Sequence, residues 1–206
     1  MKITGNDIAE LISRVETLEK KLGVTHIPKG LKIGDVFELA DVNWKILDIT
    51  AAGYMCIGNS LGDKTFDENS SDWKKSSLRT YLNGEFYEKI SKEIGANNII
   101  AFSRDLLSLD GQEEYGETDD FVSILTVDEY RKYRKHIPNA NKWWWLITPW
   151  STPCNECSEA VAVILPHGYV RYDNCRDDNG VRPVCVFSSS IFESCDQGNG
   201  RSEFNR

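Results

Sequence analysis

The sequence lacks a long hydrophobic run and an excess of basic residues. No apolar stretch approaches the roughly 18 residues of a membrane-spanning helix, so membrane insertion is not expected. Lys and Arg number 24 against 32 Asp and Glu, giving a formal net charge of −8. Nucleic acid is therefore not expected as a partner, because phosphate binding needs a basic surface. Residues 1–7 lack the apolar core of a signal peptide, which predicts synthesis in the cytoplasm without export by the usual route.

Cysteine and histidine are also scarce. Six cysteines in 206 residues are too few for a disulfide scaffold, and without a signal peptide we expect them to be mostly reduced. None of the three histidines, His26, His136 and His167, has a serine or cysteine partner at motif spacing, so no hydrolytic triad is predicted. Asp105–Asp120 is predicted to be one acidic loop. Its acidic residues between 113 and 120 lack the ligand order and the glycine of an EF-hand, and we interpret the loop as solvated.

Residues 5–23 predict a short helix with a coiled-coil seam. Apolar residues alternate in steps of three and four, the heptad pattern: Ile8, Leu11, Val15, Leu18 and Leu22. The pattern favours a homo-oligomer, preferably a trimer. The alternative is an amphipathic helix lying on its own domain. Two heptads are marginal alone, so self-association would need help from the globular part.

The remaining chain predicts one α+β domain, because strand and helix patterns are interspersed. The expected organisation is an oligomerisation helix at 1–23, a linker at 24–34, a globular domain at 35–193 and a polar tail at 194–206. Strands are expected at Val36–Leu39, Trp44–Ile49, Gly53–Gly58, Asn98–Ser103, Phe121–Leu125, Val161–Leu165, Tyr169–Tyr172 and Val184–Phe187. Helices are expected after Ser76 or Ser77, with a kink at Asn83-Gly84, and after the capping box at Thr126–Glu129.

Two polar segments interrupt the stiff stretch between Lys142 and Phe187. Tryptophans, β-branched residues and prolines bound the stretch, whereas Ser151–Glu159 and Arg171–Asn179 read as irregular loops beside one predicted hairpin. Irregular loops on a rigid frame are where binding residues concentrate, so the two segments are expected to share a face.

The cysteines raise a metal alternative, because five of the six follow residue 150. Cys154-x-x-Cys157 has the spacing of a structural zinc site, and Cys175 with Cys185 could complete four thiolates. Against this, nine residues separate the second pair, and Cys185 sits in a strand pattern. A redox pair of Cys154 and Cys157 lacks a thioredoxin-like context. We therefore predict neither a metal nor a cofactor, and interpret the cysteines as occupying exposed, substitutable positions.

Several of these segments resemble one family. Trp144–Pro149 reads WWLITP and Gly180–Pro183 reads GVRP. The pair is similar to a signature of uncharacterised bacterial and phage domains, in which W-W-L-R-[ST]-P is followed further along by G-V-R-P. Ser77–Phe86 resembles that family's internal helix, and Trp44–Asp48 its early strand. Ile147 departs from the pattern, since the family usually has arginine there, and any role of that arginine is absent here.

The resemblance implies a C-type-lectin-like fold. Some proteins of this kind are the variable proteins of diversity-generating retroelements, in which adenine-directed mutagenesis rewrites codons. A fixed scaffold would then display substituted residues to a protein or surface ligand, at a phage tail or on a cell surface, without catalysis. Arg171–Asn179 contains only residues that an AAC codon can yield after adenine substitution, whereas Glu156 and Glu159 do not fit that origin.

The expected ligand-binding surface combines aromatic and small polar residues, as an adaptable binding surface does. It comprises Trp150, Ser151, Thr152, Cys154, Asn155, Glu156, Cys157, Ser158, Glu159, Arg171, Tyr172, Asp173, Asn174, Cys175, Arg176, Asp177, Asp178 and Asn179. One alternative is a pair of merely solvated loops. A second is an enzyme on the related formylglycine-generating-enzyme scaffold, with Cys154 or Cys157 as a reactive thiol. A calcium-dependent sugar binder is not favoured, because the Glu-Pro-Asn and Trp-Asn-Asp motifs are missing.

Overall fold

The computed structural model describes residues 5, 7–8, 10–11, 13–14 and 27–193. Before residue 15 the described residues are helical and exposed, including Ile8 and Leu11 of the heptad pattern. Val15, Leu18 and Leu22, together with Cys195 and the tail at 194–206, lie outside the described residues. No helix in the described part of the chain is long and apolar enough to cross a bilayer.

The first sheet is antiparallel and contains both the first and the last strand of the domain. Its order is β1-β2-β3-β13-β5, and β8 also pairs with β13. The strands are β1 (Val36–Leu39), β2 (Val42–Thr50), β3 (Gly53–Gly58), β5 (Ile99–Ile100), β8 (Val122–Ser123) and β13 (Val184–Phe187). Before β1, the segment expected as a linker packs on the domain, because Ile27 is buried in the core and Gly30 donates its N–H to the Phe192 carbonyl at 3.0 Å.

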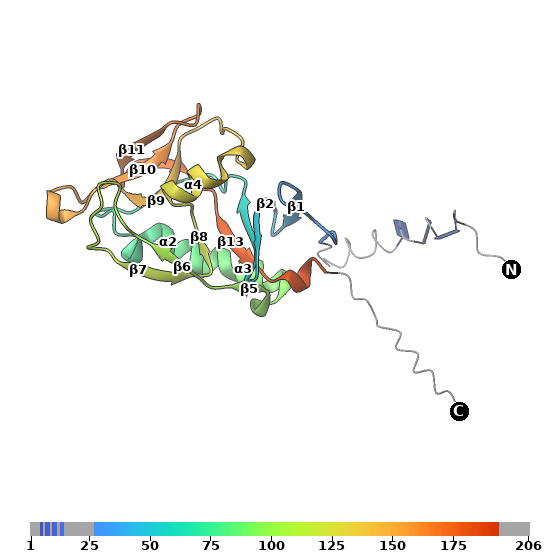
Figure 1. Ribbon diagram of the computed structural model, residues 1–206. Coiled ribbons are helices and arrows are strands. Elements are labelled where there is room, and N and C mark those ends of the chain that lie inside the picture. Colours follow the sequence, from blue (N-terminus) through green and yellow to red (C-terminus); the bar gives the residue numbers. More distant parts are fainter. Residues whose placement is uncertain (1–4, 6, 9, 12, 15–26, 194–206) are drawn as a thin grey trace.

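The second sheet carries the tryptophan motif at its centre. Its order is β11-β10-β9-β12-β4, with β11 at one edge. The strands are β4 (Asp63–Thr65), β9 (Trp144–Pro149), β10 (Ala160–Ile164), β11 (Val170–Asn174) and β12 (Asp178–Gly180). Figure 1 shows β9, β10 and β11 following one another outward to the margin of the molecule. The predicted hairpin after residue 160 is therefore confirmed.

Helices cover the sheets, and a short ribbon stands beside them. The helices are α2 (Ser77–Tyr81), α3 (Tyr87–Ile94) and α4 (Val127–Tyr133). The turns are a π turn at Leu82–Phe86 and 3₁₀ turns at Trp73–Lys75, Ala96–Asn98, Arg134–His136, Pro153–Asn155 and Ser189–Ile191. The ribbon pairs β6 (Phe102–Asp105) with β7 (Glu117–Asp120). Figure 1 shows α2, α3 and the ribbon on one side of the sheets, and α4 on another.

Local sequence explains both helix starts. Ser76 caps α2 by accepting from the Arg79 N–H, and Thr126 with Glu129 forms the predicted capping box of α4. The π turn falls at the predicted kink. There the Asn83 side chain accepts from the Val122 N–H at 3.1 Å and donates to its carbonyl at 2.8 Å, which ties the helix to β8.

The core lies on both faces of the second sheet, so every residue of β9 is buried. Trp145 and Ile147 pack with β1–β3 and with α2 and α3, whereas Trp144 and Leu146 pack with α4 and the other face of β3 and β13. A strand buried on both faces reads as a continuous apolar run, which is what the sequence shows there. Ile147 stands where the family that the sequence resembles usually has arginine, and it is fully buried among apolar neighbours.

Two sequence expectations about loops are wrong. The acidic segment Asp105–Asp120 is not one loop, because its last four residues form β7. Arg171–Asn179 is not irregular: it consists of most of β11, a turn at 175–177 and the start of β12. Both errors have one cause, since charged residues on exposed sheet edges hide the strand alternation.

Candidate functional site

An aromatic pair joins the two predicted polar segments. Trp150 follows β9, and its N–H donates to the Ala160 carbonyl at 2.9 Å. Tyr172 lies in the edge strand β11, opposite Ala162. The rings of Trp150 and Tyr172 lie 4.8 Å apart between centroids, and Tyr172 remains 49% exposed. The segments therefore share one face, as predicted, with an accessible aromatic surface between them.

Two hollows flank this pair. One has a volume of about 420 Å³ and is lined by Leu109, Asp110, Trp150, Ser151, Asn155 and Cys157. The other has a volume of about 370 Å³ and is lined by Glu156, Cys157, Ser158, Glu159, Ala160, Tyr172 and Asn174. Cys157 borders both. We call the aromatic pair with its two hollows the aromatic face.

The acidic loop after β6 braces the first segment. The Asp110 carboxylate accepts from Ser151 Oγ at 2.6 Å and from Asn155 Nδ2 at 2.8 Å. A hydrogen bond from Ser108, together with these two bonds, lowers the pKa of Asp110 to about 2, because each donor stabilises the ionised form. Glu114 of the same loop accepts from the Cys154 N–H at 3.3 Å. The loop that the sequence assigned to solvent thus holds the segment in place.

Sequence reasoning missed Leu109, Asp110 and Glu114 as parts of the site. The sequence did contain one signal, a large apolar or aromatic residue near each end of the acidic loop. These residues, Leu106 and Tyr115, are both buried in the structure. Buried residues at both ends of a polar segment anchor it to the domain, whereas a freely solvated loop has no such anchors.

The second segment is braced by polar contacts within itself and with Glu159 of the first segment. Asp173 accepts from Asn179 Nδ2 at 2.8 Å across the turn. Arg176 bonds Glu159 at 2.8 Å, and Asn174 Nδ2 donates to the same carboxylate at 3.2 Å. A hydrogen bond with the Asp173 carboxylate raises the pKa of Asp177, and partial desolvation and the negative charge of Asp173 add to the effect.

Burial divides the predicted ligand-binding residues. Four are buried: Ser151, Thr152, Cys175 and Asn179. The half-buried members are Trp150, Cys157, Ser158, Glu159 and Asp173. The exposed members are Cys154, Asn155, Glu156, Arg171, Tyr172, Asn174, Arg176, Asp177 and Asp178. The buried four expose little surface and mainly position the segments, and Ser151 is the one among them that lines a hollow of the aromatic face.

The cysteines do not converge. Cys175 is fully buried, contrary to the expectation of an exposed substitutable position, and Cys185 lies opposite Cys56 in the core of the first sheet. Among the described residues no group of three or more Cys, His, Asp or Glu side chains could hold a metal ion. Of the five cysteines that the structure describes, only Cys154 and Cys157 reach the surface.

Cys154 is poorly suited to act as a nucleophile. A hydrogen bond with the Glu114 carboxylate raises the pKa of its thiol, and the negative charge adds to the effect. A reactive cysteine needs the opposite environment, one that stabilises the thiolate. This weighs against the thiol-enzyme alternative at this position.

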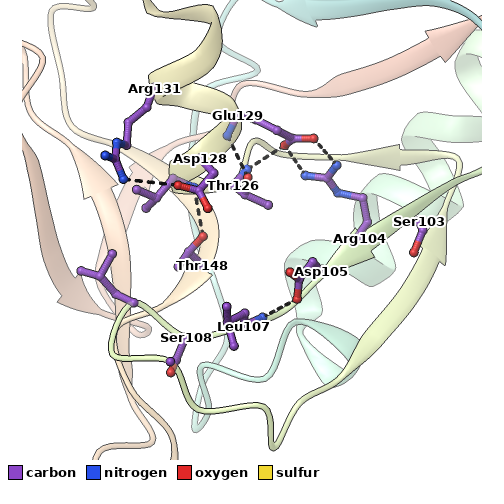
Figure 2. A pocket seen from close by; sticks show the side chains of 13 residues that line it. Ser103, Arg104, Asp105, Leu107, Ser108, Thr126, Asp128, Glu129, Arg131 and Thr148 are labelled. Atoms are coloured by element: carbon purple, nitrogen blue, oxygen red, sulfur yellow. Dashed lines mark hydrogen bonds and ion pairs between the residues drawn. The ribbon is translucent and has the colours of Figure 1, made fainter.

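A third cavity, of about 470 Å³, lies between β6 and the start of α4 (Figure 2). Arg104, which is 2% exposed, extends along it and bonds both oxygens of Glu129, at 2.7 and 2.6 Å. Thr148 Oγ1 accepts from the Val127 N–H at 3.0 Å. The main charged group in the wall is therefore already paired, and its role is to join β6 to α4.

Comparison with known proteins adds no relative: no protein-family model, curated protein or solved structure matches the chain.

Proposed function

We propose that the protein is a non-enzymatic binder that recognises a protein or surface ligand with the aromatic face. The observation that carries the proposal is the partly exposed, tilted pair of aromatic rings, Trp150 and Tyr172, between two hollows. Large aromatic side chains supply binding area at low entropic cost, and adjacent small polar groups adapt to the partner. Paired aromatic residues in partly desolvated pockets are typical of binding hot spots.

The construction of the face supports recognition over catalysis. Asp110 and Glu159, its best-placed carboxylates, are occupied by hydrogen bonds that hold the two segments. Cys154 has a raised thiol pKa. A site whose carboxylates already brace its loops can bind with little reorganisation, which lowers the entropic cost of association.

We further propose a C-type-lectin-like scaffold of the retroelement variable type, with the resemblance of WWLITP and GVRP as its basis. The residues of the two motifs fit a structural role, because Trp144, Trp145 and Gly180–Pro183 are buried. A trimer through the helix at 5–23 would multiply weak sites into avid attachment. A reverse transcriptase gene and a near-copy of the 3′ end of this gene in the neighbouring DNA are the expected genetic context. A neighbourhood without them would remove the retroelement part.

The binding proposal is tested with the double variant Trp150→Ala/Tyr172→Ala. Labelled protein is applied to arrays of bacterial envelope proteins and polysaccharides. We expect wild type to bind at least one component and the variant to lose at least ten-fold in affinity, the effect of about 1.4 kcal/mol at one hot spot. Thermal melting confirms that the variant is folded.

A matched control is available elsewhere on the surface. Tyr87 and Phe121 form another aromatic pair, also with centroids 4.8 Å apart. Tyr87→Ala/Phe121→Ala should bind as wild type does. Equal loss in both double variants, or undiminished binding without Trp150 and Tyr172, would contradict the proposal.

A further inference from the structure

The edge strand β11 presents unpaired backbone groups. Leu165 N–H donates to the Tyr169 carbonyl at 2.9 Å, and Cys175 N–H to the Glu159 carbonyl at 2.7 Å, at the two ends of the β10–β11 ladder. Bonded pairs alternate along an antiparallel ladder, so the odd residues of β11 face β10. The N–H and C=O groups of Val170, Tyr172 and Asn174 therefore point outward.

Arg171 and Asp173 place charges on this edge, but other usual protections of an edge strand are missing. It has no proline and no bulge, since the irregularity of this sheet lies between β10 and β9. Three of its neighbouring side chains are large, apolar and exposed: Tyr169 at 70%, Val170 at 36% and Tyr172 at 49%. An open edge beside exposed aromatic residues is a template for another strand.

The charges on β11 fit a second copy of β11. The outward backbone N–H and C=O groups of one β11 can bond only to the outward groups of another. Antiparallel self-pairing must therefore set the even-numbered residues of one strand opposite the even-numbered residues of the other. Three registers centre on the strand. Pairing Val170 with Tyr172 sets Arg171 against Arg171, and pairing Tyr172 with Asn174 sets Asp173 against Asp173. Like charges directly opposite destabilise a sheet, which disfavours both.

The remaining register is self-complementary. It sets Tyr172 opposite Tyr172 at a two-fold axis, and Val170 opposite Asn174. Arg171 then lies opposite Asp173 on both sides of the axis. These are non-hydrogen-bonded positions, where Cα atoms approach to about 4.5 Å and side chains meet most closely.

We propose that two copies of this chain join through β11 in that register, forming one continuous sheet. In the single copy Arg171 has no ion pair or hydrogen bond with any described residue, and the new register supplies its partner. Asn174 N–H, which donates to Asp173 Oδ1 at 3.1 Å, transfers to the Val170 carbonyl of the second copy and frees Oδ1 for Arg171. Asp173 Oδ2 keeps its bond from Asn179.

Self-pairing places two aromatic faces side by side, because Tyr172 belongs to both the edge and the face. It is independent of the helix that the sequence predicts at 5–23: if that segment forms an oligomer, β11 joins two such oligomers. The surface involved is one short strand, so association is expected only at high protein concentration.

The test uses charge reversal in the full chain, with mass measured by sedimentation over a concentration series. Arg171→Asp should halve the limiting mass, and so should Asp173→Arg. Mixing the two variants should restore it, because every cross-strand pair then joins Asp to Arg. Arg131→Asp, at an exposed arginine away from this edge, should leave the mass unchanged.

A measurement on wild type is independent of how the variants fold. Amide exchange by NMR should slow with concentration at Val170 and Tyr172, while Arg171 and Asp173 stay protected throughout by β10. The proposal would be overturned by any of three results. These are an equal mass for wild type and Arg171→Asp, a mixture of the two variants that keeps the halved mass, and amide exchange rates that do not change with protein concentration.

Discussion

The Asp110 carboxylate accepts a hydrogen bond of 2.6 Å from the hydroxyl of Ser151. The contact joins the acidic loop after β6 to the segment that follows β9. Asn155 donates to the same oxygen at 2.8 Å, so one carboxylate fixes both the start and the middle of the segment. The shape of the aromatic face therefore depends on a residue outside the two segments that form it.

We expect the order of this segment to depend on pH. The pKa of Asp110 is lowered from 3.8 to about 2, so its ionised form stabilises the folded arrangement. That contribution is complete above the unfolded value and disappears as pH falls through the folded value. Hydrogen exchange in the peptide covering 151–157 should accelerate between about pH 4 and pH 2, relative to the intrinsic rate. An unchanged protection factor would contradict the assignment.

Asp110→Asn provides the matched variant at neutral pH. The amide keeps an oxygen acceptor but loses the charge, and charge-assisted hydrogen bonds are about twice as strong as neutral ones. We expect faster exchange over 151–157 in the variant and a smaller further change as pH falls, the remainder coming from Glu114, which accepts from the Cys154 N–H. Asp105→Asn, in β6 of the same region, is the control, because its carboxylate accepts only from the nearby Leu107 N–H.

Thiol chemistry should report on the second brace. Because the Glu114 carboxylate raises the pKa of the Cys154 thiol, the thiolate fraction near neutral pH is small. Glu114→Gln should lower that pKa and speed alkylation of Cys154 by iodoacetamide, followed site by site with mass spectrometry. Buried Cys56, Cys175 and Cys185 should stay unlabelled in native protein. Equal rates at Cys154 in both proteins would show that Glu114 does not control it.

Local signals in the sequence predicted much of the fold. β1, β3 and β13 have the expected bounds, and the Thr126 capping box opens α4 as expected. Each depends on neighbouring residues alone: apolar runs in buried strands, or a side chain three residues from its partner. These elements form as the local sequence predicts because the tertiary packing favours the same secondary structure.

The site was harder to predict because its geometry is set by distant contacts. Asp110 meets Ser151 across 41 positions of sequence, and no local pattern encodes that meeting. Cys175 illustrates the same limit, since the residues around it are polar and its burial comes from packing beside Phe66 of the same core. What the sequence did indicate was the shared placement of the two segments beside one hairpin.

The buried ion pair in Figure 2 should contribute strongly to stability. Glu129→Gln leaves the Arg104 guanidinium, which is 2% exposed, without its countercharge. We expect a loss of about 3 kcal/mol in the free energy of unfolding, measured by urea denaturation. Asp128→Asn removes the neighbouring exposed pair with Arg131 and should cost less than about 1 kcal/mol. Similar losses in both would mean that the burial of Arg104 does not matter.

Two glycines should respond to alanine in opposite directions. At Gly58 an added Cβ would lie 2.8 Å from both Pro183 Cγ and Val42 Cγ1, so Gly58→Ala should cost about 1–3 kcal/mol by overpacking. At Gly84 no atom lies within 4 Å of an added Cβ. Gly84→Ala should therefore stabilise by about 0.4–1 kcal/mol, because alanine restricts the unfolded chain without a clash. Thermal unfolding of the two variants measures both signs. If Gly58→Ala left the stability unchanged, the close packing of Pro183, in the GVRP motif, against β3 would not contribute to stability.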